Sequence, residues 1–139
     1  MHLFTYGTLM DSVIMDRVAG EVFESSSAVL PGYFRKQVVN AVFPAIAPKE
    51  AEQVEGVLYL NLTLEAIERL DRFEGELYHR SPVTIHLGND HWLDAHSYVI
   101  KPELVSMMSE HDWHLDRFKE QHRHYFKNEY EGFRKLDEV

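Results

Sequence analysis

The amphipathic segment 63–75, in the middle of the chain, constrains the fold more than any other stretch. At about 100° per residue, its apolar side chains fall on one side of a helix: Leu64, Ala66, Ile67, Leu70 and Phe73. The opposite side carries charge, from Glu65, Glu68, Arg69 and Arg72. Gly75 is typical of the residue just past a helix C-terminus. The segment therefore predicts a helix that buries one face against the rest of the chain.

Glu74 breaks this pattern, because it lies four residues after Leu70 and seven after Ile67, near the middle of the apolar stripe. Carboxylates are rare there unless paired, and the C-terminal end of a helix disfavours negative charge. Burial and the helix dipole both predict a raised pKa for Glu74. Such a group suits proton transfer near neutral pH, although a structural ion pair with an arginine is the alternative for this residue taken alone.

The composition bounds the class of protein. A chain of 139 residues, 45% hydrophobic, is long enough for one domain with a real core. Its net charge of −9 argues against nucleic acid and anionic membranes as partners. The absence of cysteine excludes disulfides, thiolate nucleophiles and Cys-ligated zinc. With no leader pattern and no apolar run near the ~20 residues of a membrane span, we expect a cytoplasmic protein.

The N-terminal residues predict a strand, a glycine turn and a helix in immediate succession. Residues 2–6 have the short apolar pattern of a buried strand. Gly7, Thr8 and Leu9 follow, and residues 10–20 have helical spacing that ends at Gly20. Backbone N–H groups at such a turn can converge on an anion. This turn is a candidate carboxylate site, and an ordinary tight turn is the alternative.

The remaining segments are mainly of β type. Residues 21–30, 33–39 and 53–60 predict strands, with a turn at Pro31–Gly32 and an edge or irregular crossover at 43–48. Residues 78–87 and 91–100 predict a hairpin around 88–90, and 102–110 a short helix or turn. We expect an α+β fold, a small curled mixed sheet or partial β-barrel flanked by helices. It forms a single domain, 1–139, with 111–139 as a C-terminal helical extension that includes Trp113, Phe118, Tyr125 and Phe126.

Nine histidines invite a search for a metal site. His111 and His114 are three residues apart, but His122 and His124 point to different sides of a helix, and no metalloprotease HExxH pattern occurs. Ser25, Ser26 and Ser27 lack the sequence of a nucleophile elbow. We expect no metal and no cofactor.

The sequence resembles the gamma-glutamylcyclotransferase-like family, nearest to its small gamma-glutamylamine cyclotransferase branch, over roughly the first hundred residues. The resemblance rests on ordered motifs: Tyr6-Gly7-Thr8-Leu9, Pro44-Ala45, Gly56 with Tyr59, Leu70-Asp71-x-x-Glu74-Gly75, Tyr78-x-Arg80 and Ala95-x-x-Tyr98. It implies the family's fold and a cofactor-independent release of 5-oxoproline from a γ-glutamyl amine or γ-glutamyl amino acid, by attack of the substrate's own α-amino group.

The resemblance also implies roles for residues. Glu74 is the expected general base and acid, and Tyr6, Gly7, Thr8 and Leu9 form the expected substrate-binding turn. Tyr78, Arg80 and Tyr98 are expected to support the pocket, while Asp71 is expected to pair with an arginine or a backbone N–H. Two other functions stay open: a non-catalytic protein that binds a small molecule, and a tailoring enzyme that acts on another γ-glutamyl conjugate. The leaving amine and the oligomeric state are open as well.

Overall fold

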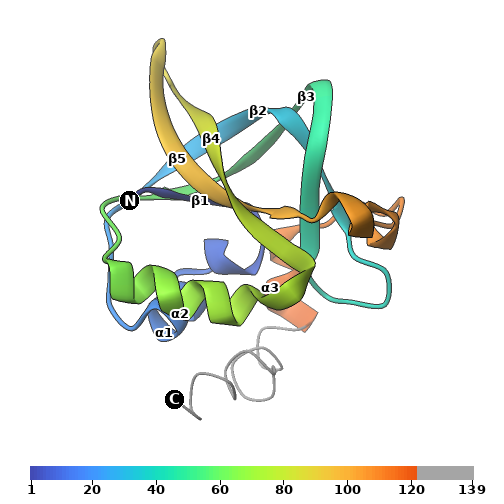
Figure 1. Ribbon diagram of the computed structural model, residues 1–139, viewed down its shortest axis with the longest axis horizontal. Coiled ribbons are helices and arrows are strands. Elements are labelled where there is room, and N and C mark those ends of the chain that lie inside the picture. The colour runs from blue at the N-terminus through green and yellow to red at the C-terminus, as the bar shows by residue number, and fades with distance from the viewer. Residues whose placement is uncertain (122–139) are drawn as a thin grey trace.

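The computed structural model describes residues 1–121, in which five strands close into a barrel with helices packed beneath it (Figure 1). The strands are β1 (Leu3–Thr5), β2 (Ser25–Gln37), β3 (Pro44–Tyr59), β4 (Tyr78–Gly88) and β5 (His91–Ile100). Around the barrel they follow the order β1-β3-β2-β4-β5. Neighbours are antiparallel except β5 and β1, which close the barrel in parallel at Leu3 and His96. The expected α+β fold with a mixed barrel is confirmed.

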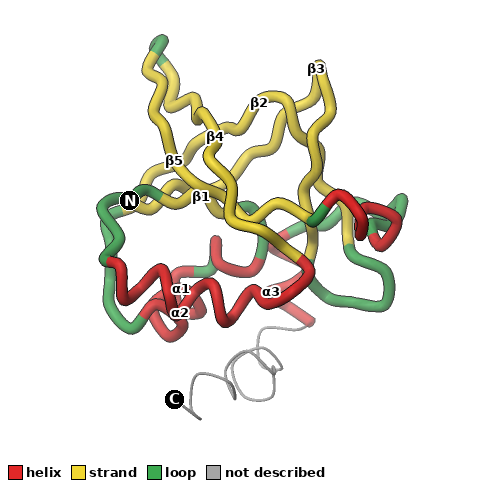
Figure 2. Tube along the Cα trace, in the orientation of Figure 1, coloured by secondary structure: helices red, strands yellow, loops and turns green. Residues whose placement is uncertain are grey.

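The helical elements connect and cover this barrel (Figure 2). They are η1 (Thr8–Met10), α1 (Ser12–Ala19), α2 (Leu64–Glu74), η2 (Gly75–Leu77), η3 (Pro102–Met107) and α3 (Leu115–Gln121). Local chemistry sets their ends. Asp11 caps α1 by accepting from the Val13 N–H at 3.0 Å, and Thr63 caps α2 by accepting from the Ala66 N–H at 3.1 Å. Gly20 ends α1 in the left-handed conformation, with φ of 87°.

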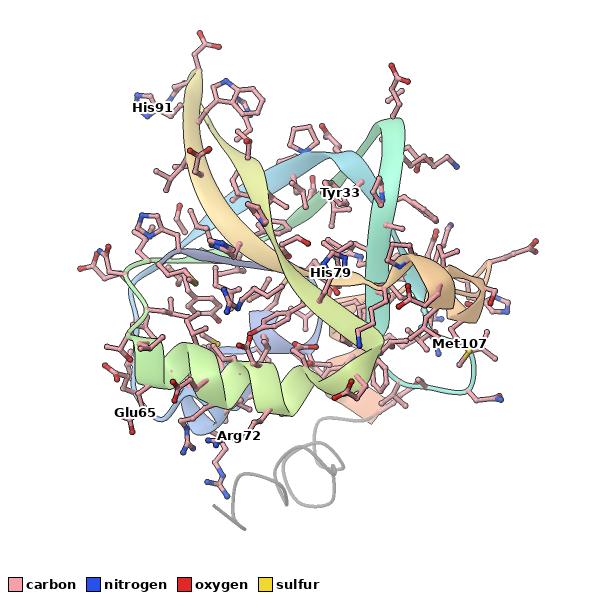
Figure 3. All side chains as sticks on the ribbon, in the orientation of Figure 1. Tyr33, Glu65, Arg72, His79, His91 and Met107 are labelled. Carbon is pink, nitrogen blue, oxygen red and sulfur yellow. The ribbon has the colours of Figure 1, made fainter. Side chains whose placement is uncertain are left out.

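Helix α2 buries the face that its sequence pattern predicts, with one exception. Ala66, Ile67, Leu70 and Phe73 are buried, while Glu65 and Arg72 point away from the barrel (Figure 3). Leu64 was predicted to join the buried stripe, but it is 73% exposed. It is the first helical residue, and because helical side chains lean toward the N-terminus, its side chain extends past the surface on which α2 packs.

Strands β2 and β3 are longer than the sequence predicted. Instead of a turn at Pro31–Gly32, β2 runs on through these residues, and its pairing with β3 extends from Ser25 and Tyr59 to Gln37 and Pro44. The register shifts between Pro31 and Tyr33. The expected turn is therefore a bend within a continuous ladder, which residues 49–52 of β3 accommodate as a bulge. Cross-strand hydrogen bonding overrides the local turn signal there.

The β4–β5 hairpin is confirmed. Its two loop residues, Asn89 and Asp90, both have positive φ, of 49° and 60°, as the favoured two-residue hairpin turns require. The hairpin projects from the barrel, with His91 at its tip (Figure 3).

Two apolar clusters hold the fold together. Phe4, Leu30, Ile46, Leu58 and Ile85 fill the barrel interior. A second cluster lies between the barrel wall and the helices and includes Leu3, Ile14, Met15, Val18, Ile67, Leu70 and Phe118. Strand β1 serves both clusters because its successive side chains point to opposite faces. The end of β1 therefore lies where the two clusters meet.

The segment that precedes α3 packs into the second cluster through Trp113, and α3 itself packs there through Phe118. Predicted features at His122, His124, Tyr125 and Phe126 lie outside the described residues. Within residues 1–121 we find no helix with the length and apolar character needed to span a membrane.

Candidate active site

A pocket lies between the end of β1, the η1 turn and the end of α2. Its lining comprises Phe4, Thr5, Tyr6, Gly7, Thr8, Leu9, Phe43, Pro44, Phe73, Glu74, Tyr78 and Tyr98. The enclosed volume is about 20 Å³, which is room for about one water molecule, so any larger ligand would extend beyond the enclosed part. Seven predicted site residues therefore come together from four separate segments. The eighth, Arg80, does not line the pocket.

Glu74 reaches the pocket from the last turn of α2. The helix ends immediately after it, because Gly75 has a φ of 74° and its N–H bonds back to the Asp71 carbonyl. Burial raises the pKa of Glu74 to about 8, and the nearby charge of Asp71 adds to the effect. The pKa of Glu74 is thus shifted upward, as the sequence predicted. Its second cause is Asp71, which the sequence pattern did not connect with Glu74.

Asp71 anchors a network beside Glu74. Its carboxylate accepts from Arg80 Nε at 3.0 Å and from the Tyr98 hydroxyl at 2.7 Å. The expected pairing of Asp71 with an arginine is confirmed, and its partner is Arg80. The ion pair, chiefly a hydrogen bond to Asp71, raises the pKa of Arg80. Arg80 therefore contacts the network around Glu74 rather than the pocket itself.

Buried tyrosine hydroxyls brace the pocket walls. The Tyr6 hydroxyl donates to the Tyr98 carbonyl at 2.6 Å, and the Tyr78 hydroxyl donates to the Pro44 carbonyl at 2.7 Å. Tyr59, which the site prediction did not include, donates to the Leu9 carbonyl at 2.9 Å. Burial raises the pKa of Tyr6 and of Tyr98 above the ordinary value. These phenols therefore stay protonated and hold backbone or carboxylate oxygens in place.

The glycine turn differs in detail from its prediction. The single turn η1 separates β1 from α1, and the Asp11 side chain caps α1 itself. In η1 the Met10 N–H donates to the Gly7 carbonyl at 3.0 Å and the Asp11 N–H to the Thr8 carbonyl at 3.1 Å. The preceding N–H groups, of Thr8 and Leu9, have no acceptor within this turn. The candidate anion site is thus the turn at residues 7–9 and not the N-terminus of α1.

Gly7 is required there by a close approach. A Cβ atom at this position would lie 2.8 Å from Cγ of Pro44, well inside van der Waals contact. Pro44 belongs to the predicted Pro44–Ala45 motif, so the two motifs meet at the pocket wall. Any side chain at position 7 would push β3 away from the turn.

The arrangement brings a carboxyl group with a raised pKa and the backbone of the turn at residues 7–9 into the lining of one small pocket. Among the described residues, no lysine, arginine or histidine side chain lines this pocket. Residues 1–121 also contain no group of three or more His, Asp or Glu side chains that could hold a metal ion.

A closed five-stranded barrel with this pocket defines a protein with the gamma-glutamyl cyclotransferase fold. The chain belongs to the family described as "Gamma-glutamyl cyclotransferase, AIG2-like", whose model matches residues 3–115.

Relatives of known sequence and structure agree with this membership. AIG2-like protein D of Arabidopsis thaliana is 29% identical over 128 residues, which cover 85% of this chain and 84% of the relative. A solution structure of an Arabidopsis thaliana protein is 28% identical in sequence and has a TM-score of 0.70. The match covers 99% of this chain and 90% of the chain in that structure. The structure of a gamma-glutamyl cyclotransferase shares the fold at 18% sequence identity, with a TM-score of 0.59. The match covers 72% of this chain and 66% of the chain in that structure.

Proposed function

We propose that this protein releases 5-oxoproline from a γ-glutamyl amine or γ-glutamyl amino acid, with Glu74 as general base and acid. The observation that carries the proposal is the position of Glu74, a partly buried carboxyl group in the pocket with a pKa of about 8, across from the turn at residues 7–9. Membership of a family of gamma-glutamyl cyclotransferases supports the same chemistry.

In the proposed reaction, the substrate's α-amino nitrogen forms a bond to its own γ-carbonyl carbon, and the bond from that carbon to the leaving nitrogen breaks. The α-ammonium nitrogen loses two protons as it becomes the ring N–H. Glu74 takes the first before the attack and returns it to the leaving nitrogen, and the second, lost once the new C–N bond has formed, protonates the departing amine. The products are 5-oxoproline and the free amine, with no oxidant, cofactor or external nucleophile. Because both reacting groups belong to one molecule, holding the substrate curled supplies much of the rate.

We place γ-glutamyl amines ahead of γ-glutamyl amino acids as substrates. An amino-acid leaving group brings a second carboxylate into a pocket that Glu74 already lines and that no cationic side chain lines among the described residues. A leaving amine without that carboxylate avoids the repulsion. This reasoning supports the gamma-glutamylamine branch of the family.

The proposal is tested by measuring 5-oxoproline release from a panel of γ-glutamyl amines, γ-glutamyl amino acids and other γ-glutamyl conjugates. We expect turnover, with kcat/KM highest for the amines. Release from one other conjugate alone would instead indicate a tailoring enzyme. Binding of the panel without any release would contradict the proposal and favour a binding protein.

The pH dependence follows from the raised pKa of Glu74. Below about 8 the Glu74 carboxyl is protonated in the free enzyme and cannot accept a proton. We therefore expect kcat/KM to fall about tenfold for each pH unit below that value. The measurement is kcat/KM across the neutral and acidic range, with stability checked at each pH. A profile that stays flat down to the ordinary range of a glutamate would contradict the raised pKa of Glu74.

A further inference from the structure

Arg35 contacts the backbone of the pocket turn from behind. This residue of β2 is partly buried, and its Nη1 donates to the Tyr6 carbonyl at 2.7 Å and to the Glu55 carbonyl at 3.2 Å. Its side chain lines two other surface grooves and is not among the residues that line the pocket. Arg35 therefore acts on the turn without contacting the pocket contents.

The guanidinium is held in place from its other side as well. It stacks over the ring of Trp113, 5.7 Å from the centroid, and Trp113 is buried and donates from Nε1 to the Val42 carbonyl at 2.9 Å. Val42 precedes Phe43 and Pro44, which line the pocket. The segment before α3 thus contacts both the guanidinium and the residue that precedes this part of the pocket wall.

Peptide geometry carries the effect of Arg35 into the pocket. Residues 1–121 contain no cis peptide bond, and in a trans peptide the C=O and N–H point in opposite directions. The Tyr6 carbonyl points toward Arg35, so the Gly7 N–H points away from it. Gly7 itself lines the pocket.

We propose that Arg35 is a positioning residue, which holds the Tyr6–Gly7 peptide so that the Gly7 N–H binds the carboxylate of the substrate. The identity of that substrate rests on the proposed function. Since no lysine or arginine lines the pocket among the described residues, a bound carboxylate depends on neutral donors, and the Gly7 N–H is one of them. A cation bonded to the carbonyl of the same peptide polarises it and makes its N–H a better donor.

The kinetic test compares Arg35→Gln with Lys36→Gln. Lys36 is the neighbour of Arg35 on β2 and pairs with Asp112 at 2.5 Å, so its replacement removes the same charge and a link to the same C-terminal segment without touching Tyr6. Because a carboxylate that does not react is bound equally in the ground and transition states, Arg35→Gln should raise KM by about tenfold or more. We expect kcat to change little, and Lys36→Gln to leave both constants near the wild-type values. A fall in kcat at constant KM would overturn the carboxylate role.

A second measurement does not depend on turnover. The backbone amide of Gly7 is one of seven glycine amides in the chain, and its NMR shift reports the hydrogen bond on the Tyr6 carbonyl. In Arg35→Gln this amide should move more than any other glycine amide, with a smaller change in Arg35→Lys and none in Lys36→Gln. Titration with 5-oxoproline should then show a dissociation constant raised by about tenfold in Arg35→Gln.

The two proposals fail separately. A wild-type protein that turns over no γ-glutamyl compound rejects the proposed function only. A Gly7 amide that is unmoved in both Arg35 variants, or equal affinity of wild type and Arg35→Gln for 5-oxoproline, rejects the role of Arg35 whatever the turnover.

Discussion

Replacing Glu74 by glutamine is expected to lower the release of 5-oxoproline by about two to four orders of magnitude, the usual contribution of a general base. Glutamine keeps the shape of the side chain and can still donate and accept hydrogen bonds, but it cannot take the proton from the substrate's α-ammonium group. The loss should appear in kcat, because the substrate still binds to the turn at residues 7–9.

The same substitution is expected to stabilise the folded protein. Burial raises the pKa of Glu74 from its ordinary 4.5 to about 8, so the folded state holds a proton that the unfolded state releases as the pH rises above 4.5. The cost to the folded state grows through this window and is about 3 kcal/mol at pH 7. Glutamine, always neutral, removes this cost. The gain in the free energy of unfolding should therefore be present at pH 7 and vanish near pH 4.

Chemical denaturation at both pH values, alongside turnover, separates loss of the base from loss of the fold. Glu68→Gln is the matched control, because Glu68 is an exposed residue of the same helix, and we expect it to alter neither property by much. A Glu74→Gln protein that is well folded and retains wild-type turnover would reject Glu74 as the base.

Replacing Gly56 by alanine is expected to destabilise the protein by at least about 3 kcal/mol. A Cβ at this position would lie 2.1 Å from the Thr5 carbonyl oxygen and 2.6 Å from the Phe4 ring. The first contact is with the backbone of β1, where Thr5 pairs with the next residue, Val57, so a side-chain rotation cannot relieve it. Strand β1 must shift, and with it the turn that begins at Tyr6.

Thermal and urea unfolding of Gly56→Ala measure this effect, with Gly32→Ala as the control. A Cβ at Gly32 meets nothing within 4 Å, but its φ is +83°, so that variant carries only the cost of a left-handed backbone, about 1 to 2 kcal/mol. Equal destabilisation in the two variants would show that the contact between β1 and β3 is looser than described. A much larger loss in Gly56→Ala is the expected result.

Much of the fold was predictable because its signals are local. The spacing of Ile67, Leu70 and Phe73 placed one face of α2 in the core, and Gly75 marked the end of that helix. The same spacing placed Glu74 on the buried side, since residues three, four and seven apart share a face of a helix. The turn residues Gly88, Asn89 and Asp90 predicted the β4–β5 hairpin.

The errors arose where distant segments compete with local signals. Pro31–Gly32 has turn chemistry, yet β2 continues through it because β3 supplies cross-strand partners on both sides. Leu64 matches the apolar stripe but lies beyond the surface that α2 covers.

By itself, then, the sequence determined the helices, the β4–β5 hairpin, the α+β class and the candidate proton acceptor, because each depends on residues close to one another in the chain. Only the tertiary structure decided what surrounds that acceptor. Tyr78 meets the Pro44 carbonyl across 34 residues, and Arg35 meets the Tyr6 carbonyl across 29. Closure of the barrel creates these contacts, and the burial that raises the pKa of Glu74 exists only once the strands and helices around it have packed.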